Sequence, residues 1–207
     1  PDGSVELFIS SEKERAYPDG LGEYQKPGTG VWSIDRLSAA RIESLAVSSF
    51  ESVLENFDQP GYLHVKDPVV FDAPDGSTAL VFCTHPFTWA SSNSGLALRP
   101  KGTQHFDLIS WEVASRGTTW DVAATRITNR MRLPAQGVLA ELGEMYAYFY
   151  DGAECMRRLD ENPYARSRPR GYSCEELGGA LLGAALPTAP LQRLSRLQPL
   201  FVAPHGS

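Results

Sequence analysis

A lysine, an aspartate and a proline adjoin one another at Lys66-Asp67-Pro68, beside the apolar run Val69-Val70-Phe71. The proline predicts extended backbone at Asp67, which would hold the carboxylate in a fixed direction. Two carboxyl groups on either side of a glycosidic bond can hydrolyse it, one as an acid of raised pKa and one ionised. We take Asp67 as a candidate catalytic carboxylate and Lys66 as a substrate-binding residue; the alternative is that Asp67 only caps a turn or pairs with Lys66.

Several other residues could serve the same chemistry. A carboxylate in a glycine turn and an arginine that can hold a carboxylate through two parallel hydrogen bonds are candidates for catalysis and binding, respectively. The segment 85–89 contains a histidine, a phenylalanine and a tryptophan. It would suit a sugar ligand, because aromatic faces stack on the C–H surfaces of a sugar ring. These candidates are Asp151 for catalysis, and Arg126, His85, Trp89 and His205 for substrate binding. The alternatives are that Asp151 only forms a turn, that Arg126 only pairs with a neighbouring residue, and that the segment 85–89 is an aromatic cluster covering a sheet edge.

A repeated turn indicates the elements that position these residues. Pro-Asp-Gly-Ser occurs at 1–4 and again at 74–77, and a weaker copy, Leu142-Gly143-Glu144, follows. Each copy runs into a strand-like segment, and prolines at 68, 134 and 204 recur with the turn glycines at 3, 76 and 143. A period of about 70 residues predicts a repeated β unit, longer than the roughly 40–50 residues of simple propeller repeats.

The repeat predicts an all-β fold of propeller-like, four-stranded antiparallel blades. We expect one domain over 1–207 with blade repeats at 1–60, 61–130 and 131–200, and with the proline strand as the innermost one, where no ladder donor is needed. Apolar residues at helical spacing predict one inserted helix near 38–57. The strands are expected at 5–10, 30–34, 64–71, 77–84, 94–98, 106–114, 137–140, 144–150 and 178–182.

Three repeats are fewer than the four blades a propeller needs. We therefore expect that the chain is part of a longer propeller, or that a second chain closes it.

Bulk properties exclude several functions. The net charge is −6 and there is no basic stripe, which argues against nucleic acid as a partner. No apolar run reaches the roughly 18 residues of a membrane helix. The four histidines have no metal-type spacing and no phosphate-binding glycine loop is present, so we expect no metal and no cofactor. The sequence suits a soluble protein and leaves a cytoplasmic or a secreted location open.

The segment Lys66–Phe71, with Asp75-Gly76 and the strand that follows, resembles a blade of the five-bladed propeller glycosidases, the arabinanase, β-xylosidase and invertase group. Tyr146–Gly152 and Glu176–Ala180 resemble other blade strands of that group. The resemblance implies that Asp67 is one of two axial aspartates and that a glutamate acid lies near 134–137. Gln136 stands there instead, and Glu141, the nearest carboxylate, becomes the third catalytic candidate.

Two alternatives to hydrolysis of this type stay open. Glutamine cannot donate a proton as a general acid, so Gln136 favours a non-catalytic carbohydrate-binding or scaffold propeller. A sialidase-like hydrolase is the second alternative, because Gly117-Thr118-Thr119-Trp120 resembles the end of the Asp-box turn of that family. Val113 and Ser115 replace the serine and aspartate of that turn. Under every alternative the expected ligand is a carbohydrate or glycoside.

Overall fold

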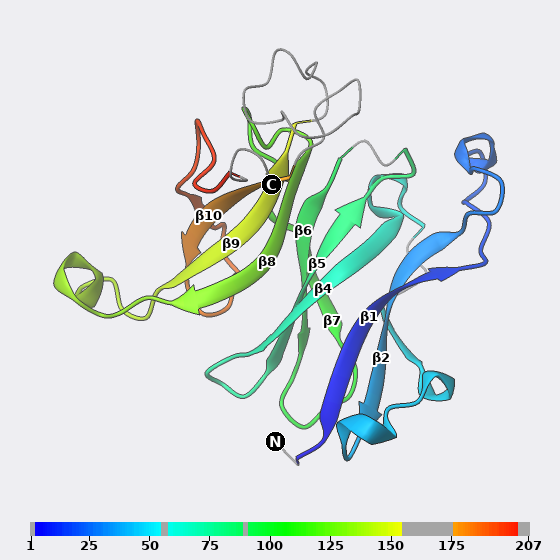
Figure 1. Cartoon of the computed structure of the whole chain (residues 1–207), viewed down its shortest axis with the longest axis horizontal. Coiled ribbons are helices and arrows are strands. Elements are labelled where there is room, and N and C mark those ends of the chain that lie inside the picture. The colour runs from blue at the N-terminus through cyan, green and yellow to red at the C-terminus, as the bar shows by residue number, and fades with distance from the viewer. Residues whose placement is uncertain (1–2, 55–57, 89–90, 155–175, 203–207) are drawn as a thin grey trace.

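Three antiparallel β-sheets lie side by side in the computed structural model, which describes residues 3–54, 58–88, 91–154 and 176–202 (Figure 1). Sheet A has the order β1-β2-β3 and sheet B the order β4-β5-β6-β7, while sheet C has the order β11-β10-β9-β8. Their strands are β1 (Val5–Lys13), β2 (Val31–Ala39) and β3 (Glu51–Leu54) in A; β4 (His64–Asp72), β5 (Thr78–His85), β6 (Asn93–Arg99) and β7 (Asp107–Ala114) in B; and β8 (Ala124–Arg132), β9 (Tyr146–Ala153), β10 (Leu177–Gly183) and β11 (Gln192–Arg193) in C. The all-β prediction is confirmed.

Short 3-10 turns supply the helical residues of the described chain. They are η1 (Gly22–Tyr24), η2 (Ile42–Ser44), η3 (Val47–Ser49), η4 (Pro60–Tyr62) and η5 (Gly137–Ala140). Within the described ranges, no helix is long and apolar enough to cross a membrane.

The turn glycines mark corresponding points of the three sheets. Gly3, Gly76 and Gly143 all have left-handed φ values, of 84°, 83° and 76°, and they precede β1, β5 and β9. The packing recurs as well, because β4 contacts β1 and β2 of sheet A, just as β8 contacts β5 and β6 of sheet B. By this correspondence β1 and β2 of sheet A match β5 and β6 of sheet B.

The core lies between neighbouring sheets, with sheet B in the middle. Every residue of β5 is buried, and its side chains alternate between the two faces. Leu80 and Phe82 pack with Ile34 of sheet A, whereas Ala79 and Val81 pack with Tyr148 and other residues of sheet C. Burial on both faces explains why β5 is a continuous apolar run rather than an alternating one.

The predicted helix near 38–57 is wrong. Strand β2 continues to Ala39, and β3 then pairs with β2, with Glu51 opposite Arg36. Two of the apolar residues at helical spacing do not pack against the core, since Ile42 and Phe50 are 66% and 43% exposed. The ion pair between Arg36 and Glu51 favours the strand instead.

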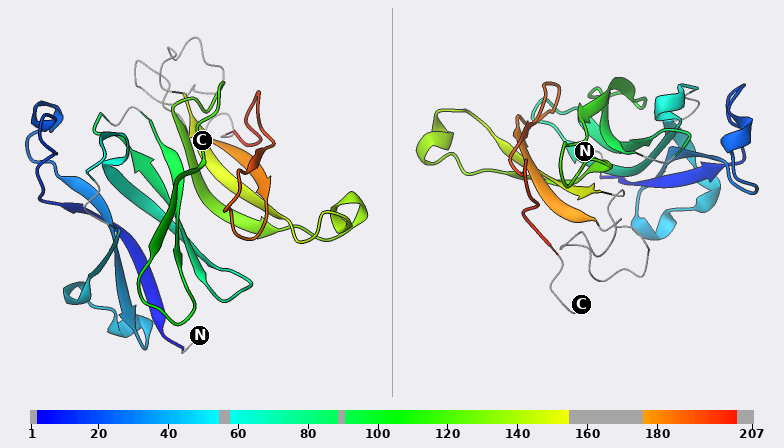
Figure 2. Two further views of the ribbon diagram at one scale, coloured as in Figure 1. Left: turned by 180° about the vertical axis from the view of Figure 1, so that it is seen from behind. Right: turned by 90° about the horizontal axis from the view of Figure 1, so that it is seen from above.

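The strand predicted at 137–140 is also wrong. This segment is η5, at the tip of a long β8–β9 connection that extends away from the sheets (Figure 2). Gly137 has φ 58° and Val138 is 77% exposed, so no ladder or core supports a strand. Pro134 lies in this connection, and the first strand of sheet C is β8. Pro204 lies outside the described residues.

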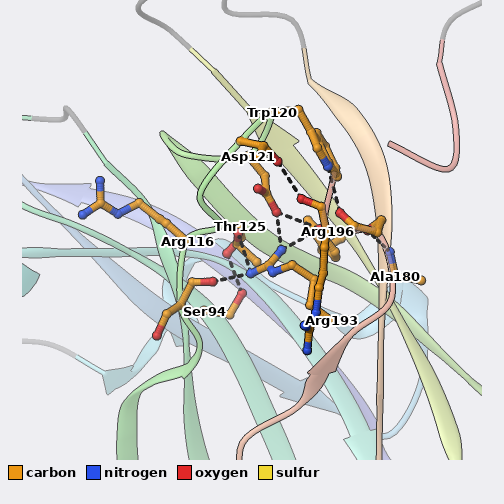
Figure 3. A network of polar contacts seen from close by, with 12 residues as sticks. Ser94, Arg116, Trp120, Asp121, Thr125, Ala180, Arg193 and Arg196 are labelled. Atoms are coloured by element: carbon orange, nitrogen blue, oxygen red, sulfur yellow. Dashed lines mark hydrogen bonds and ion pairs between the residues drawn. The ribbon is translucent and has the colours of Figure 1, made fainter. Parts of the chain in front are cut away.

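A buried polar network fastens the end of sheet C to the β7–β8 connection (Figure 3). Asp121 is fully buried and accepts hydrogen bonds from Arg193 and from the Tyr150 hydroxyl, at 2.8 Å for the latter. Trp120 Nε1 donates to the Ser195 carbonyl at 2.9 Å, and Thr119 Oγ1 donates to the Arg196 carbonyl at 2.6 Å. The turn that resembles the Asp-box therefore holds the segment at 195–196 against the β7–β8 connection.

Glycine in β10 makes room for an aromatic ring of β9. Gly179 lies opposite Tyr150, and a Cβ at Gly179 would meet the ring at 2.3 Å. We predict that Gly179→Ala lowers the free energy of unfolding by about 1–3 kcal/mol, as overpacking does. Gly61→Ala is the matched control, because nothing lies within 4 Å of its Cβ position. Urea unfolding measures both; equal losses in the two variants would contradict the prediction.

Candidate functional site

A pocket of about 420 Å³ lies where β4 of sheet B faces β8 and β9 of sheet C. Four of the residues predicted from the sequence line it together: Lys66, Asp67, Arg126 and Asp151. The other described lining residues are Pro68, Val69, Cys83, Ile127, Thr128 and Glu176. Three carboxylates and two cationic side chains thus share one pocket.

A β-bulge in β4 places Asp67. Lys66 pairs with Cys83 and Val69 pairs with Val81, so Asp67 and Pro68 together oppose a single residue of β5. Asp67 has φ 54°, and the extended backbone predicted for it is therefore wrong. The proline disfavours right-handed helical geometry at Asp67, and aspartate is one of the few residues that adopt the left-handed region readily. The Lys66 ammonium is 3.8 Å from the Asp67 carboxylate.

Strand β6 fixes the backbone on both sides of Arg126. The Ser94 hydroxyl accepts a hydrogen bond from the Ile127 amide at 2.8 Å and donates to the Thr125 carbonyl at 3.0 Å. Thr125 and Ile127 are buried, so the alternation of β8 turns Arg126 to the opposite face, toward the pocket. There Arg126 forms an ion pair with Glu176.

Asp151 lies among charges of both signs. It is directly opposite Arg126 in the β8–β9 ladder, a distance at which side chains interact. Burial raises the pKa of Asp151, and the negative charges of Glu176 and Asp67 raise it further, against the opposing effect of Arg126. The surroundings of Asp151 therefore favour its protonated form.

Two histidines and a thiol lie on the same stretch of β4 and β5. Cys83 is buried, and burial raises the pKa of its thiol, so it is not a ready nucleophile. His64 and His85 form a buried cross-strand pair. The Trp32 amide donates to His64 Nδ1 at 3.2 Å, which leaves Nε2–H to donate to the Tyr17 hydroxyl at 3.0 Å. His85, predicted to bind substrate, is not among the described residues that line the pocket.

Of the remaining predicted residues, the structure describes Glu141, which does not line this pocket. Glu141 is exposed and directly follows η5, in the β8–β9 connection away from the sheets (Figure 1). Trp89 and His205 lie outside the described residues. Sequence reasoning gave Glu176 no role; its position immediately before a strand that pairs with the strand of Asp151 was the available signal.

Metal chemistry has no evident ligand set here. Within the part of the chain that the structure describes, no group of three or more His, Cys, Asp or Glu side chains could hold a metal ion. The described lining combines three carboxyl groups with two cationic side chains.

The buried histidines predict a loss of stability in weak acid. Burial lowers the pKa of His64 to about 4 and that of His85 to about 3, below the roughly 6.5 of an unfolded chain. The unfolded state then binds protons first, so this stability is present above pH ~6.5 and is lost as pH falls. We expect a loss of about 1.4 kcal/mol per pH unit for each histidine.

Denaturant unfolding between pH 7 and pH 5 measures this slope, and His64→Gln should reduce it by about half, since one of two titrating groups is gone. His105→Gln is the control, because His105 is exposed. An unchanged slope in His64→Gln would show that the pair does not govern acid stability.

The charges around Asp151 predict the direction in which substitutions move its pKa. Glu176→Gln should lower this pKa, because a negative neighbour is removed and Arg126 is released from its ion pair. Asp67→Asn should lower it by less, since Asp67 contributes less to the shift. Glu141→Gln should leave it unchanged. Carboxyl ¹³C NMR titration reports each value, and a rise in Glu176→Gln would refute the assignment.

Known proteins resemble this chain in backbone structure and not in sequence. No protein-family model matches the sequence and no curated protein matches it. Among solved structures, a glycosyl hydrolase from Bacteroides ovatus has a TM-score of 0.43 at 8% identity, over 96% of this chain and 68% of that chain. A glycosidase-named protein from Bacteroides thetaiotaomicron has a TM-score of 0.42 at 10% identity, over 100% and 72%. An ulvan lyase has a TM-score of 0.42 at 13% identity, over 87% and 36%.

Proposed function

We propose that this chain is a carbohydrate-active protein whose pocket cleaves a glycosidic bond. Asp151 is the general acid and Asp67 is the base or nucleophile. Lys66 and Arg126 bind the substrate, and Glu176 holds Arg126 in place. Glu141, which lies in the β8–β9 connection, has no role in this proposal.

The convergence of Asp67 and Asp151 from two different sheets carries the proposal. Glycosidic cleavage needs two carboxyl groups with separated pKa values on either side of one bond. Asp67 is in β4 and is exposed, with the Lys66 ammonium 3.8 Å from its carboxylate. Asp151 is in β9, where burial and two negative neighbours raise its pKa. The two environments divide the roles of base and acid.

The rest of the lining suits a sugar. Arg126, Lys66 and Thr128 present donors for ring hydroxyls, while Pro68 and Val69 offer apolar surface to C–H groups. A ligand site of this kind combines apolar lining with a few polar groups that fix orientation. The volume of about 420 Å³ is within the usual range for small-molecule sites.

Binding without cleavage is the second candidate, and the ion pairs favour it. Glu176 is paired with Arg126, and Asp67 is paired with Lys66. If both pairs persist with sugar bound, Asp151 is the one lining carboxyl outside an ion pair in the described part of the chain, and a single carboxyl does not complete the acid–base pair.

We also propose that the three sheets are successive blades of one propeller-like domain. The support is the repeated packing step, in which the first strand of one sheet packs against the second and third strand positions of the sheet before it, β4 on β1 and β2 and β8 on β5 and β6. Closure of the ring would need further blades, from a longer chain or from a second chain.

Substitution of Asp67 tests the proposed chemistry. Asp67→Asn removes the charge, and asparagine also adopts left-handed backbone, so the bulge should persist. We expect hydrolysis of aryl glycosides and oligosaccharides to fall about 10²- to 10⁴-fold with an unchanged unfolding midpoint. Asp151→Asn should lose most activity on poor leaving groups and least on dinitrophenyl glycosides, which need no acid.

Glu141→Gln is the matched control and should keep full activity. Turnover that survives Asp67→Asn would refute the assigned mechanism. Calorimetric binding of an oligosaccharide by the wild-type protein, without turnover of any glycoside, would instead establish the binding candidate.

A further inference from the structure

Asp67 combines a pocket-lining carboxylate with an unfavourable backbone conformation. Among the residues that the structure describes, it is the non-glycine residue with a positive φ, at 54°. Such residues persist only where the surroundings hold them, and they gather at functional sites. The bulge also removes Asp67 from the regular pairing of β4 with β5, so its amide has no ladder partner in β5.

A serine of the neighbouring sheet supplies the missing partner. The Asp67 amide donates to Ser10 Oγ at 2.8 Å, and Ser10 belongs to β1 of sheet A. Pro68 has no amide proton, so the Asp67 amide is the one donor that the two bulged residues possess. No residue of sheet A is among the described residues that line the pocket, yet this hydrogen bond connects sheet A to it.

We propose that Ser10 is a positioning residue that holds the Asp67 carboxylate in the pocket through the Asp67 amide. The proposal rests on the function proposed above for Asp67. Without the Ser10 hydroxyl, Asp67 can return to extended backbone. Because side chains alternate along a strand, a change of backbone geometry at one residue redirects its side chain away from its present face.

Kinetics distinguish positioning from general stability. Ser10→Ala should lower kcat about 10- to 100-fold, the size of loss that follows when a reacting group is displaced by about 1 Å. KM should change little, because Lys66, Arg126 and Asp151 stay in place. Ser10→Thr keeps the hydroxyl and suits a strand, so it should restore activity. Ser38→Ala, which removes an exposed serine hydroxyl from β2, is the matched control and should match the wild type.

NMR tests the same inference without any substrate. In the wild type, the backbone ¹³C shifts and the HN–Hα coupling of Asp67 should report left-handed geometry, and its amide should be protected from hydrogen exchange. Ser10→Ala should lose this protection and move both signals toward extended values, while Ser10→Thr and Ser38→Ala should not. If wild-type protein cleaves no glycoside, the proposed function fails, but these signals still decide whether Ser10 positions Asp67.

Unchanged Asp67 signals in Ser10→Ala would overturn the proposal, and so would equal kcat in Ser10→Ala and Ser38→Ala. If Ser10→Ala does not fold, Ser10→Cys and Ser10→Thr replace it. Their Asp67 amide protection should then follow the strength of the acceptor, oxygen above sulfur, and equal protection in both would reject the role of Ser10.

Discussion

The double burial of β5 is the constraint on which the structure depends. A strand that is apolar on both faces needs a sheet on each side, and sheets A and C must therefore be held against sheet B. Polar contacts set their orientation. Glu6 of β1 accepts two hydrogen bonds of 2.6 Å from Arg99 of β6, and these bonds lower the pKa of Glu6. On the other side, Ser94 fastens β6 to the backbone of β8.

The pocket follows from this arrangement, because its charged residues come from different sheets. Asp67 lies in a bulge of sheet B and its amide is bonded to a serine of sheet A, whereas Arg126 and Asp151 face each other within sheet C. Three carboxylates in one pocket repel one another, and two cations do not neutralise all three. Asp151 is the most buried of the three carboxyl groups, and burial together with the charges of Glu176 and Asp67 raises its pKa.

Local signals in the sequence located much of this correctly. Turn glycines and apolar runs identified most strands of sheets A, B and C, and residue chemistry singled out Lys66, Asp67, Arg126 and Asp151. The errors arose where local pattern competes with pairing. Ile42, Leu45 and Phe50 belong to a helical pattern, but an amphipathic helix must pack its apolar face against a surface, and β3 pairs with β2 instead. Glu176 could not be recognised because its contact with Arg126 depends on a register that spans a bulge in β8 and two long connections.

Bulges in β4 and β8 explain why the pocket lies between sheets B and C. Strand β4 breaks its ladder at Asp67-Pro68, and β8 breaks its ladder between Ile127 and Asn129, where Thr128 lines the pocket. In a regular strand the amides donate hydrogen bonds to the neighbouring strands, and alternate side chains point to a packed face. A bulge releases one amide and redirects one side chain, so first strands of adjacent sheets that bulge at the same level leave polar groups facing a common space. The departure from regular pairing is thus the feature that turns an interface between two packed sheets into a site for a polar ligand.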